Sequence, residues 1–406
     1  MLSTHHSEID VQAERSSRIQ PAWILIIGII FIAAALRAPF TSVGPLLNTI
    51  RDSIGISNTL AGILTTLPLL AFALVSPFAP KLARRYGQER VLFGALILLA
   101  LGILIRWIPS PAPLFIGTGV LASAIAIGNV LLPSLIKQNF PHQIGLLTGI
   151  YTASMNLGAA IAIGLSVPLA ENMGLNWNGS LGFWIIIVII SLILWLPQLR
   201  HFVPLAGLTS ATAKTNMWRS ALAWQVTVFM GLQSIIFYVT ITWFPDILID
   251  RGFSPTSAGW MISLMQFAQL PMTFILPILA GRMKDQRSLV IFSSALYFIG
   301  IIGFSIGEGW VIPVSSIILG IAGGSTFSLA MMLFTLRTRT TQEAAELSGM
   351  AQSFGYILAA VGPLFFGMLN DISGEWTLSL VLLFAASVLL LLFGLGATRN
   401  KFISEN

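Results

Sequence analysis

Twelve long apolar runs constrain this chain more than any other feature of its sequence. The hydrocarbon core of a bilayer is crossed by about 20 apolar residues in a helix, so these runs predict twelve membrane helices. Only 9% of the 406 residues are charged, whereas soluble proteins carry about 25%. We predict the spans near 22–50, 57–80, 89–108, 112–137, 144–170, 180–198, 218–248, 256–280, 288–306, 310–337, 343–370 and 375–397.

The basic residues indicate how the chain is oriented in the membrane. With a cytoplasmic N-terminus, 17 of the 21 Lys and Arg residues fall on the cytoplasmic side, and three (Arg51, Arg106 and Arg251) fall outside. Short cytoplasmic loops are enriched in Lys and Arg. We therefore expect a multi-pass protein of the cell inner membrane with both termini cytoplasmic. The net charge of +6 lies in these loops and does not indicate a nucleic-acid partner.

The sequence also repeats itself at a spacing of about 200 residues. PKLARRYGQER (80–90) resembles PILAGRMKDQR (277–287), and LTGIYTASMNLGAA (147–160) resembles LSGMAQSFGYILAA (347–360). Several matches in the same order predict two parallel six-helix halves with a substrate site at their interface.

This repeat predicts how the chain is divided. We expect a disordered cytoplasmic tail at 1–20, an N-terminal six-helix bundle at 21–198, a cytoplasmic linker at 199–217, a C-terminal six-helix bundle at 218–398 and a cytoplasmic tail at 399–406. The predicted fold class is an all-α polytopic membrane protein with two pseudo-symmetric bundles.

Twelve spans, a 6+6 repeat and a basic loop after the second span resemble the major facilitator superfamily. The loop PKLARRYGQER keeps Arg85 and Gly87 of the superfamily's signature loop, but Arg84 stands at its acidic position. Five strings more narrowly resemble the cyanate and 2-nitroimidazole transporters: LRAPFTSVGPLL, GILTTLPLLAFALVSP, GNVLLPSLIK, WRSALAWQVT and LSGMAQSFGY. The resemblance implies the major facilitator fold, with a cavity lined by both halves.

Arg37 is the one basic residue that we predict within the membrane, away from the ends of the spans. It follows Trp23 by 14 residues, or about 21 Å along a helix, and no acidic residue lies within two helical turns of it in the sequence. Charges at this depth are costly and mark substrate pathways, so we predict that Arg37 binds substrate. Snorkelling towards the membrane surface is the alternative. A guanidinium is a planar fork that suits planar or anionic acceptors.

The remaining candidates are aromatic and amide side chains within the spans. Phe237 occupies the position related to Arg37 by the repeat, and Tyr238 follows it. An arginine facing aromatic rings would form a slot for a small flat substrate, although both rings could instead only pack helices. The polar candidates, for which helix–helix hydrogen bonding is the alternative, are Asn129, Tyr151, Asn156, Gln233, Gln266, Gln269, Gln352 and Tyr356.

These features favour a secondary active or facilitative transporter of a small planar or anionic solute, such as a cyanate-like anion or a nitroimidazole-like heterocycle. It would work by alternating access around a central site. A broad-specificity drug exporter and a non-transporting membrane sensor are the alternatives. The chain has no cysteine and no buried cluster of carboxylates or histidines, so we predict no enzyme, catalytic residue, cofactor or metal site. We expect a monomer whose partners are its solute and the lipid bilayer.

Overall fold

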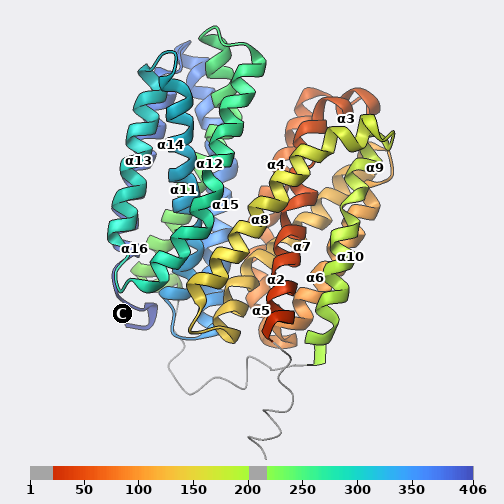
Figure 1. Cartoon of the computed structure of the whole chain (residues 1–406), viewed down its shortest axis with the longest axis vertical. Coiled ribbons are helices and arrows are strands. Elements are labelled where there is room, and N and C mark those ends of the chain that lie inside the picture. Colours follow the sequence, from red (N-terminus) through yellow and green to blue (C-terminus); the bar gives the residue numbers. More distant parts are fainter. Residues whose placement is uncertain (1–21, 201–216, 406) are drawn as a thin grey trace, which may run out of the picture.

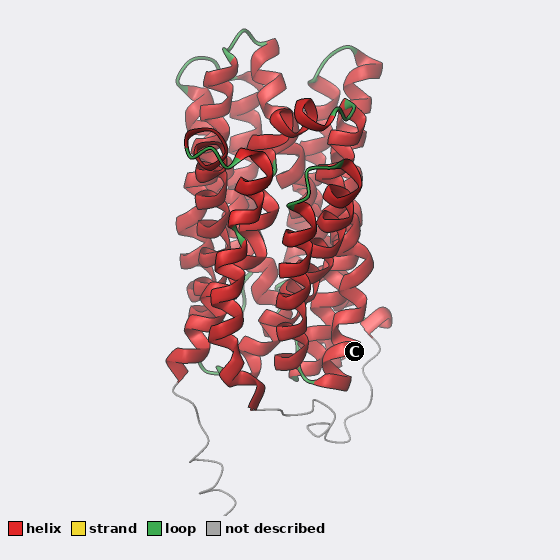
Figure 2. Cartoon of the chain, turned by 90° about the vertical axis from the view of Figure 1, so that its right-hand side faces the viewer, coloured by secondary structure: helices red, strands yellow, loops and turns green. Residues whose placement is uncertain are grey.

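The computed structural model describes residues 22–200 and 217–405, and these two ranges are helical with no strand (Figure 2). The predicted tail at 1–20 and most of the predicted linker at 199–217 lie outside the described residues, so that division stays a prediction. Twelve helical segments are long and apolar enough to cross a membrane, which confirms the predicted number. The chain is therefore a multi-pass membrane protein.

The helices form two groups (Figure 1). The N-terminal half contains α2 (Ala22–Thr41), α3 (Leu47–Ile54), α4 (Asn58–Val75), α5 (Ala79–Tyr86), α6 (Gln88–Arg106), α7 (Pro111–Asn139), α8 (Ile144–Val167), α9 (Asn176–Phe183) and α10 (Ile185–Trp195). The C-terminal half contains α11 (Ala221–Asp250), α12 (Pro255–Arg282), α13 (Arg287–Ile306), α14 (Val311–Leu336), α15 (Thr341–Ser373) and α16 (Thr377–Ala397).

Local sequence signals set the helix ends between the apolar runs. At the start of α15, the Thr340 side chain accepts from the Glu343 backbone N–H, and the Glu343 carboxylate accepts from the Thr340 N–H. This capping box satisfies two backbone donors that the first turn leaves free. The same helix ends at Gly374, whose φ of 71° is the left-handed conformation that glycine adopts without strain.

The two halves approach each other most closely at one end of the molecule. In Figure 1 they converge where α2 begins and α16 ends, which we call the terminal end, and they diverge at the opposite, distal end. Glycines bring the helices together there: a Cβ at Gly149 in α8 would lie 2.7 Å from the Phe274 carbonyl oxygen in α12. A Cβ at Gly349 in α15 would lie 2.9 Å from the Ser76 carbonyl oxygen. These two glycines are related by the 200-residue repeat.

Hydroxyl groups hydrogen-bond across the same two contacts. Thr152 Oγ1 in α8 donates to the Thr273 carbonyl oxygen in α12 at 2.5 Å. Ser353 Oγ in α15 donates to the Ala73 carbonyl oxygen in α4 at 2.6 Å. Both bonds join the two halves, so the terminal end is closed by a seam built in the same way on two sides; we call these two contacts the seam.

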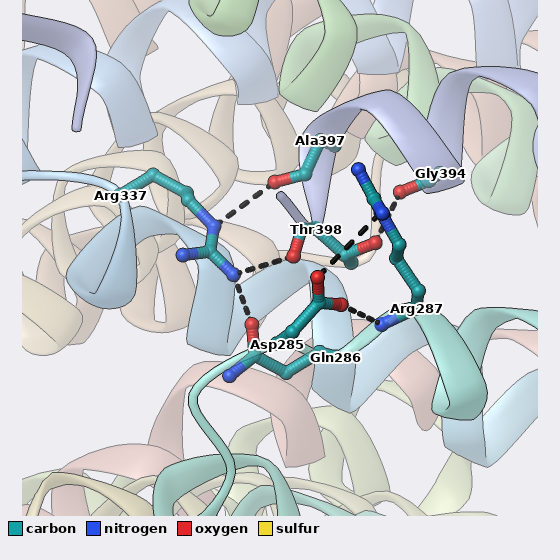
Figure 3. A network of polar contacts seen from close by, with 7 residues as sticks. All are labelled: Asp285, Gln286, Arg287, Arg337, Gly394, Ala397 and Thr398. Atoms are coloured by element: carbon teal, nitrogen blue, oxygen red, sulfur yellow. Dashed lines mark hydrogen bonds and ion pairs between the residues drawn. The ribbon is translucent and has the colours of Figure 1, made fainter. Parts of the chain in front are cut away.

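At the terminal end of the C-terminal half, Arg337 joins three elements (Figure 3). Its Nε donates to the Ala397 carbonyl oxygen at 3.0 Å, and its Nη2 donates to the Thr398 carbonyl oxygen at 3.0 Å and to Gln286 Oε1. Burial lowers the pKa of the Arg337 guanidinium to about 10, so it stays charged at neutral pH. The chain beyond residue 399, expected as a tail, packs on this network: the Ile403 side chain is 1% exposed.

Arg106, expected on the outer side near the end of the third span, is the last residue of α6 and is only 1% exposed. Its Nη1 donates to the Pro39 carbonyl oxygen of α2 at 2.9 Å. Pro39 lies in the last turn of α2, where backbone carbonyls have no partner within the helix. A cation at a helix C-terminus is also favoured by the helix dipole, which accounts for the burial.

Candidate functional site

A cavity of about 340 Å³, which includes space open to solvent, lies where α2 of the N-terminal half faces the C-terminal half. Arg37 is the residue that α2 contributes, and α11, α12, α14 and α15 supply the rest of the wall. The lining residues are Arg37, Met230, Gln233, Ser234, Phe237, Tyr238, Gln269, Phe327 and Tyr356. The structure thus gathers six of the eleven predicted site residues around one space.

Arg37 is half-buried on α2 and its charge is not neutralised by an acid. Among the described residues, no carboxylate forms an ion pair with it. Its guanidinium carbon lies 5.8 Å from the centre of the Phe327 ring, within the range of a cation–π contact. It also interacts electrostatically with the hydroxyls of Tyr151, Tyr238 and Tyr356. A guanidinium has only donors, so these contacts leave room for an anionic or electron-rich ligand.

Aromatic rings form the part of the wall that faces Arg37. Phe237 and Tyr238 meet edge to face, with ring centres 5.2 Å apart and planes at 87°. Tyr356 packs on Phe72 of α4 at 4.9 Å between ring centres. The predicted combination of one arginine with the Phe237 and Tyr238 rings is therefore present in one cavity, and Phe327 and Tyr356 add two more rings.

Five predicted residues do not line the cavity. Asn156 lies directly behind it, because its Oδ1 accepts from Nε2 of the lining residue Gln269 at 3.3 Å. Gln352 Nε2 donates to the backbone oxygen of Asn129 at 3.0 Å, so this pair joins α15 to α7. Tyr151 is fully buried, with its hydroxyl close enough to Arg37 to interact electrostatically.

Gln266 is the fifth of these residues. It is half-buried on α12, away from the cavity, and its Oε1 is buried without a hydrogen-bond partner. Its spacing from Gln269 made it a candidate, but the two amides have different surroundings in the structure.

Three lining residues were not predicted. Met230 and Ser234 precede Tyr238 by eight and four residues on α11. Residues four apart share a helix face, so this spacing could have identified both. Phe327 on α14 follows a Gly-Gly-Ser-Thr stretch, and nothing local to that segment indicates that it faces Arg37.

Comparison with known proteins identifies the family. A sequence model of the Major Facilitator Superfamily matches residues 25–363 and 226–402. The chain belongs to the major facilitator superfamily. Among solved structures, the major facilitator proton:xylose symporter XylE matches with a TM-score of 0.77 over 94% of this chain and 98% of its own, at 13% identity. That likeness shows the major facilitator fold, as the sequence predicts.

Curated relatives in the superfamily are transporters. The uncharacterized transporter YycB of Bacillus subtilis (strain 168) is 48% identical over 96% of this chain and 97% of its own. The 2-nitroimidazole transporter of Escherichia coli (strain K12) is 44% identical over 94% of this chain and 96% of its own. The cyanate transport protein CynX of the same organism is 26% identical over 87% of this chain and 91% of its own. The predicted resemblance to cyanate and 2-nitroimidazole transporters is confirmed.

Proposed function

We propose that this major facilitator transporter carries a small flat solute with an electron-rich or anionic end, such as a nitroimidazole-like heterocycle. The observation that carries the proposal is Arg37, a cation without an acidic partner among the described residues, on the wall of a cavity whose other walls come from the opposite half. Polar residues at this depth are costly unless function requires them. The guanidinium would bind the electron-rich end of the solute as a planar fork.

The lining of the cavity supports a small solute, because nine side chains from α2, α11, α12, α14 and α15 surround one narrow space. The four aromatic residues that line the cavity with Arg37 suit a flat ring, which gains from edge-to-face or offset stacking. The 44% identical relative is named for 2-nitroimidazole, a flat heterocycle with a nitro group. A broad drug exporter would be better served by a larger apolar space.

Alternating access is the mechanism we propose, with the terminal end on the cytoplasmic side. The seam closes the terminal end through two contacts related by the repeat, at α8–α12 and α15–α4. Rocking the halves apart there would open the cavity to that side while the distal end closes. The Lys and Arg content of the loops supports a cytoplasmic position for the terminal end, in a bacterial-type inner membrane.

Uptake into proteoliposomes tests the function. Vesicles that contain the wild-type protein should take up labelled 2-nitroimidazole faster than protein-free vesicles and faster than vesicles with Arg37→Gln. The substituted protein keeps a polar side chain at the site, and its melting temperature should stay within a few degrees of wild type. Equal uptake by the wild type and by Arg37→Gln would show that this arginine does not bind the solute.

The orientation has its own test, which uses the absence of cysteine from the chain. Glu308 lies in the exposed loop between α13 and α14, and His142 in the exposed loop between α7 and α8. In intact cells, a membrane-impermeant thiol reagent should label Glu308→Cys and leave His142→Cys unlabelled until the cells are broken. The reverse pattern would place the terminal end outside.

A further inference from the structure

The hydrogen bonds behind the cavity wall determine which end of the Gln233 amide is free. Ser234 Oγ donates to the Met230 carbonyl oxygen at 2.9 Å within α11. A hydroxyl has one proton to donate, so in its 2.7 Å contact with Gln233 it must accept from Nε2. The positions of amide nitrogen and oxygen are usually assigned from such networks. With Nε2 turned towards Ser234, every contact of this network is a hydrogen bond.

Both hydrogens of the Gln233 nitrogen are therefore engaged. One is directed at Ser234 Oγ and the other at Met230 Sδ, 3.2 Å away. Among the described residues, none donates a hydrogen bond to Oε1, and this atom keeps some exposed surface, unlike Oε1 of Gln266 and of Gln352. Gln233 lines the cavity, which puts this amide within reach of a bound solute.

The cavity thus presents donors at one end and acceptors at the other. Arg37 of the N-terminal half offers only donors. Gln233 of the C-terminal half offers an acceptor, as does Gln269, whose Nε2 is bonded to Asn156. Gln233 and Tyr238, whose hydroxyl interacts with Arg37, are five residues apart on α11. That separation is about 7.5 Å along the helix axis. A solute that reached both ends would need an acceptor at one end and a donor at the other.

We propose that Gln233 is the specificity-determining residue that accepts a hydrogen bond from an N–H or O–H of the solute. This inference rests on the proposed function and narrows its substrate class to flat heterocycles that combine an electron-rich group with a free ring N–H. A bare inorganic anion such as cyanate has no such donor. It would leave Oε1 unpaired in a desolvated site, which is how binding sites reject analogues that lack a hydrogen-bonding group.

Binding of two ligands that differ by one group tests this assignment. The purified full-length protein is titrated calorimetrically with 2-nitroimidazole and with 1-methyl-2-nitroimidazole, which lacks the ring N–H. We expect the wild type to bind the first at least about tenfold more tightly than the second, because methylation removes the donor and leaves the acceptor unpaired. In Gln233→Leu the preference should fall to near one, chiefly through weaker binding of 2-nitroimidazole.

Gln266→Leu is the matched control, since it makes the same substitution in an amide outside the cavity, and it should keep the wild-type preference. If the wild type binds both ligands equally, or if Gln233→Leu weakens both by the same factor, Gln233 is not the acceptor and the proposed function still stands. If the wild type binds neither nitroimidazole but binds cyanate, the inference is wrong and a small anion is the solute. Binding of none of the three would overturn the proposed function as well.

Discussion

The two halves of the molecule follow the same path of helices but place different chemistry at related positions. Arg37 of α2 corresponds to Phe237 of α11, and both line the same cavity. One half thus supplies a cation and the other supplies rings and an amide oxygen. The seam shows the opposite behaviour, because related glycines and hydroxyls make nearly the same contacts on its two sides. Residues that match across the repeat make the contacts between the halves, whereas residues that differ across the repeat line the cavity.

A second departure occurs at the terminal end. Lys137 at the end of α7 and Arg337 after α14 are related by the repeat, yet they bond in different directions. Lys137 Nζ reaches into the other half, where it donates to the Thr335 carbonyl oxygen and to Thr338 Oγ1, each at 2.8 Å. Arg337 bonds within its own half. One cation therefore holds the halves together, while the other holds a single half in shape.

The largest effect should come from removing the cation that distinguishes the two cavity walls. Loss of a buried charged partner costs roughly 2–5 kcal/mol, so Arg37→Gln should weaken 2-nitroimidazole binding about 30-fold or more. Arg37→Lys keeps the charge but loses the planar fork, and should bind only weakly. Calorimetry measures the affinities, and Phe237→Leu at the related position is the control, with a much smaller loss expected. Equal losses of affinity in Arg37→Gln and Phe237→Leu would show that the two related positions do not differ in their role in binding.

Substitutions of Lys137 and Arg337 should have different effects, one on the contact between the halves and the other on the melting temperature. Hydrogen bonds to charged groups contribute about 1.5–3 kcal/mol, so Arg337→Met should lower the melting temperature by several degrees. Lys137→Met should leave it nearly unchanged, because the bonds that it removes join the two halves and do not hold either half together.

The conformational readout is a cysteine at Met332, which is fully buried beside the Gly145–Gly281 contact between the halves. Lys137→Met should raise the rate at which a thiol reagent labels the cysteine at position 332 by about tenfold. Arg337→Met should not raise this rate beyond the effect of its lower stability. If both variants only lower the melting temperature, the distinction between the two cations is wrong.

The smallest effect should come from the tyrosine hydroxyl beside Arg37. Tyr238→Phe keeps the ring in the cavity and removes the group that interacts with the guanidinium. The hydroxyl affects the solute only through the guanidinium, so we expect a threefold to tenfold loss of affinity, or about 0.7–1.4 kcal/mol. Tyr238→Ala should lose more, since the stacking surface goes as well. If Tyr238→Phe weakens binding as much as Arg37→Gln, the hydroxyl rather than the cation holds the solute.

The sequence predicted what depends on local pattern. The spans are visible because each one must be apolar along its own length, and Arg37 stands out against such a run. Span one was predicted near 22–50, and within it α2 ends at Thr41, where a 3₁₀ turn, Gly44–Leu46, separates it from α3. Pro45 is the middle residue of that turn, whereas the related Pro245 lies inside the unbroken α11. The same residue type at related positions gives different backbones, because packing around it decides the outcome.

The site was predictable only in part for a similar reason. Phe327 faces Arg37 because α14 packs beside α12 and α11, which is a property of the folded molecule and not of its local sequence. The free oxygen of Gln233 depends on a chain of three hydrogen-bonding groups whose geometry no spacing rule supplies. Residue type and helix face identified Gln233 as a candidate, and its role required coordinates.

The glycine contacts of the seam also bear on how fast the molecule can cycle. Where Gly149 meets the Phe274 carbonyl, helix backbones touch with no side chain inserted between them. Surfaces that interlock through long side chains must withdraw each one from a packed socket before they separate, and close-packed interiors resist such movement. Two smooth backbones can part without any rotamer change. Resistance to opening at this end would therefore come from the hydrogen bonds that cross between the halves, those of Thr152, Ser353 and Lys137, and not from the glycine contacts.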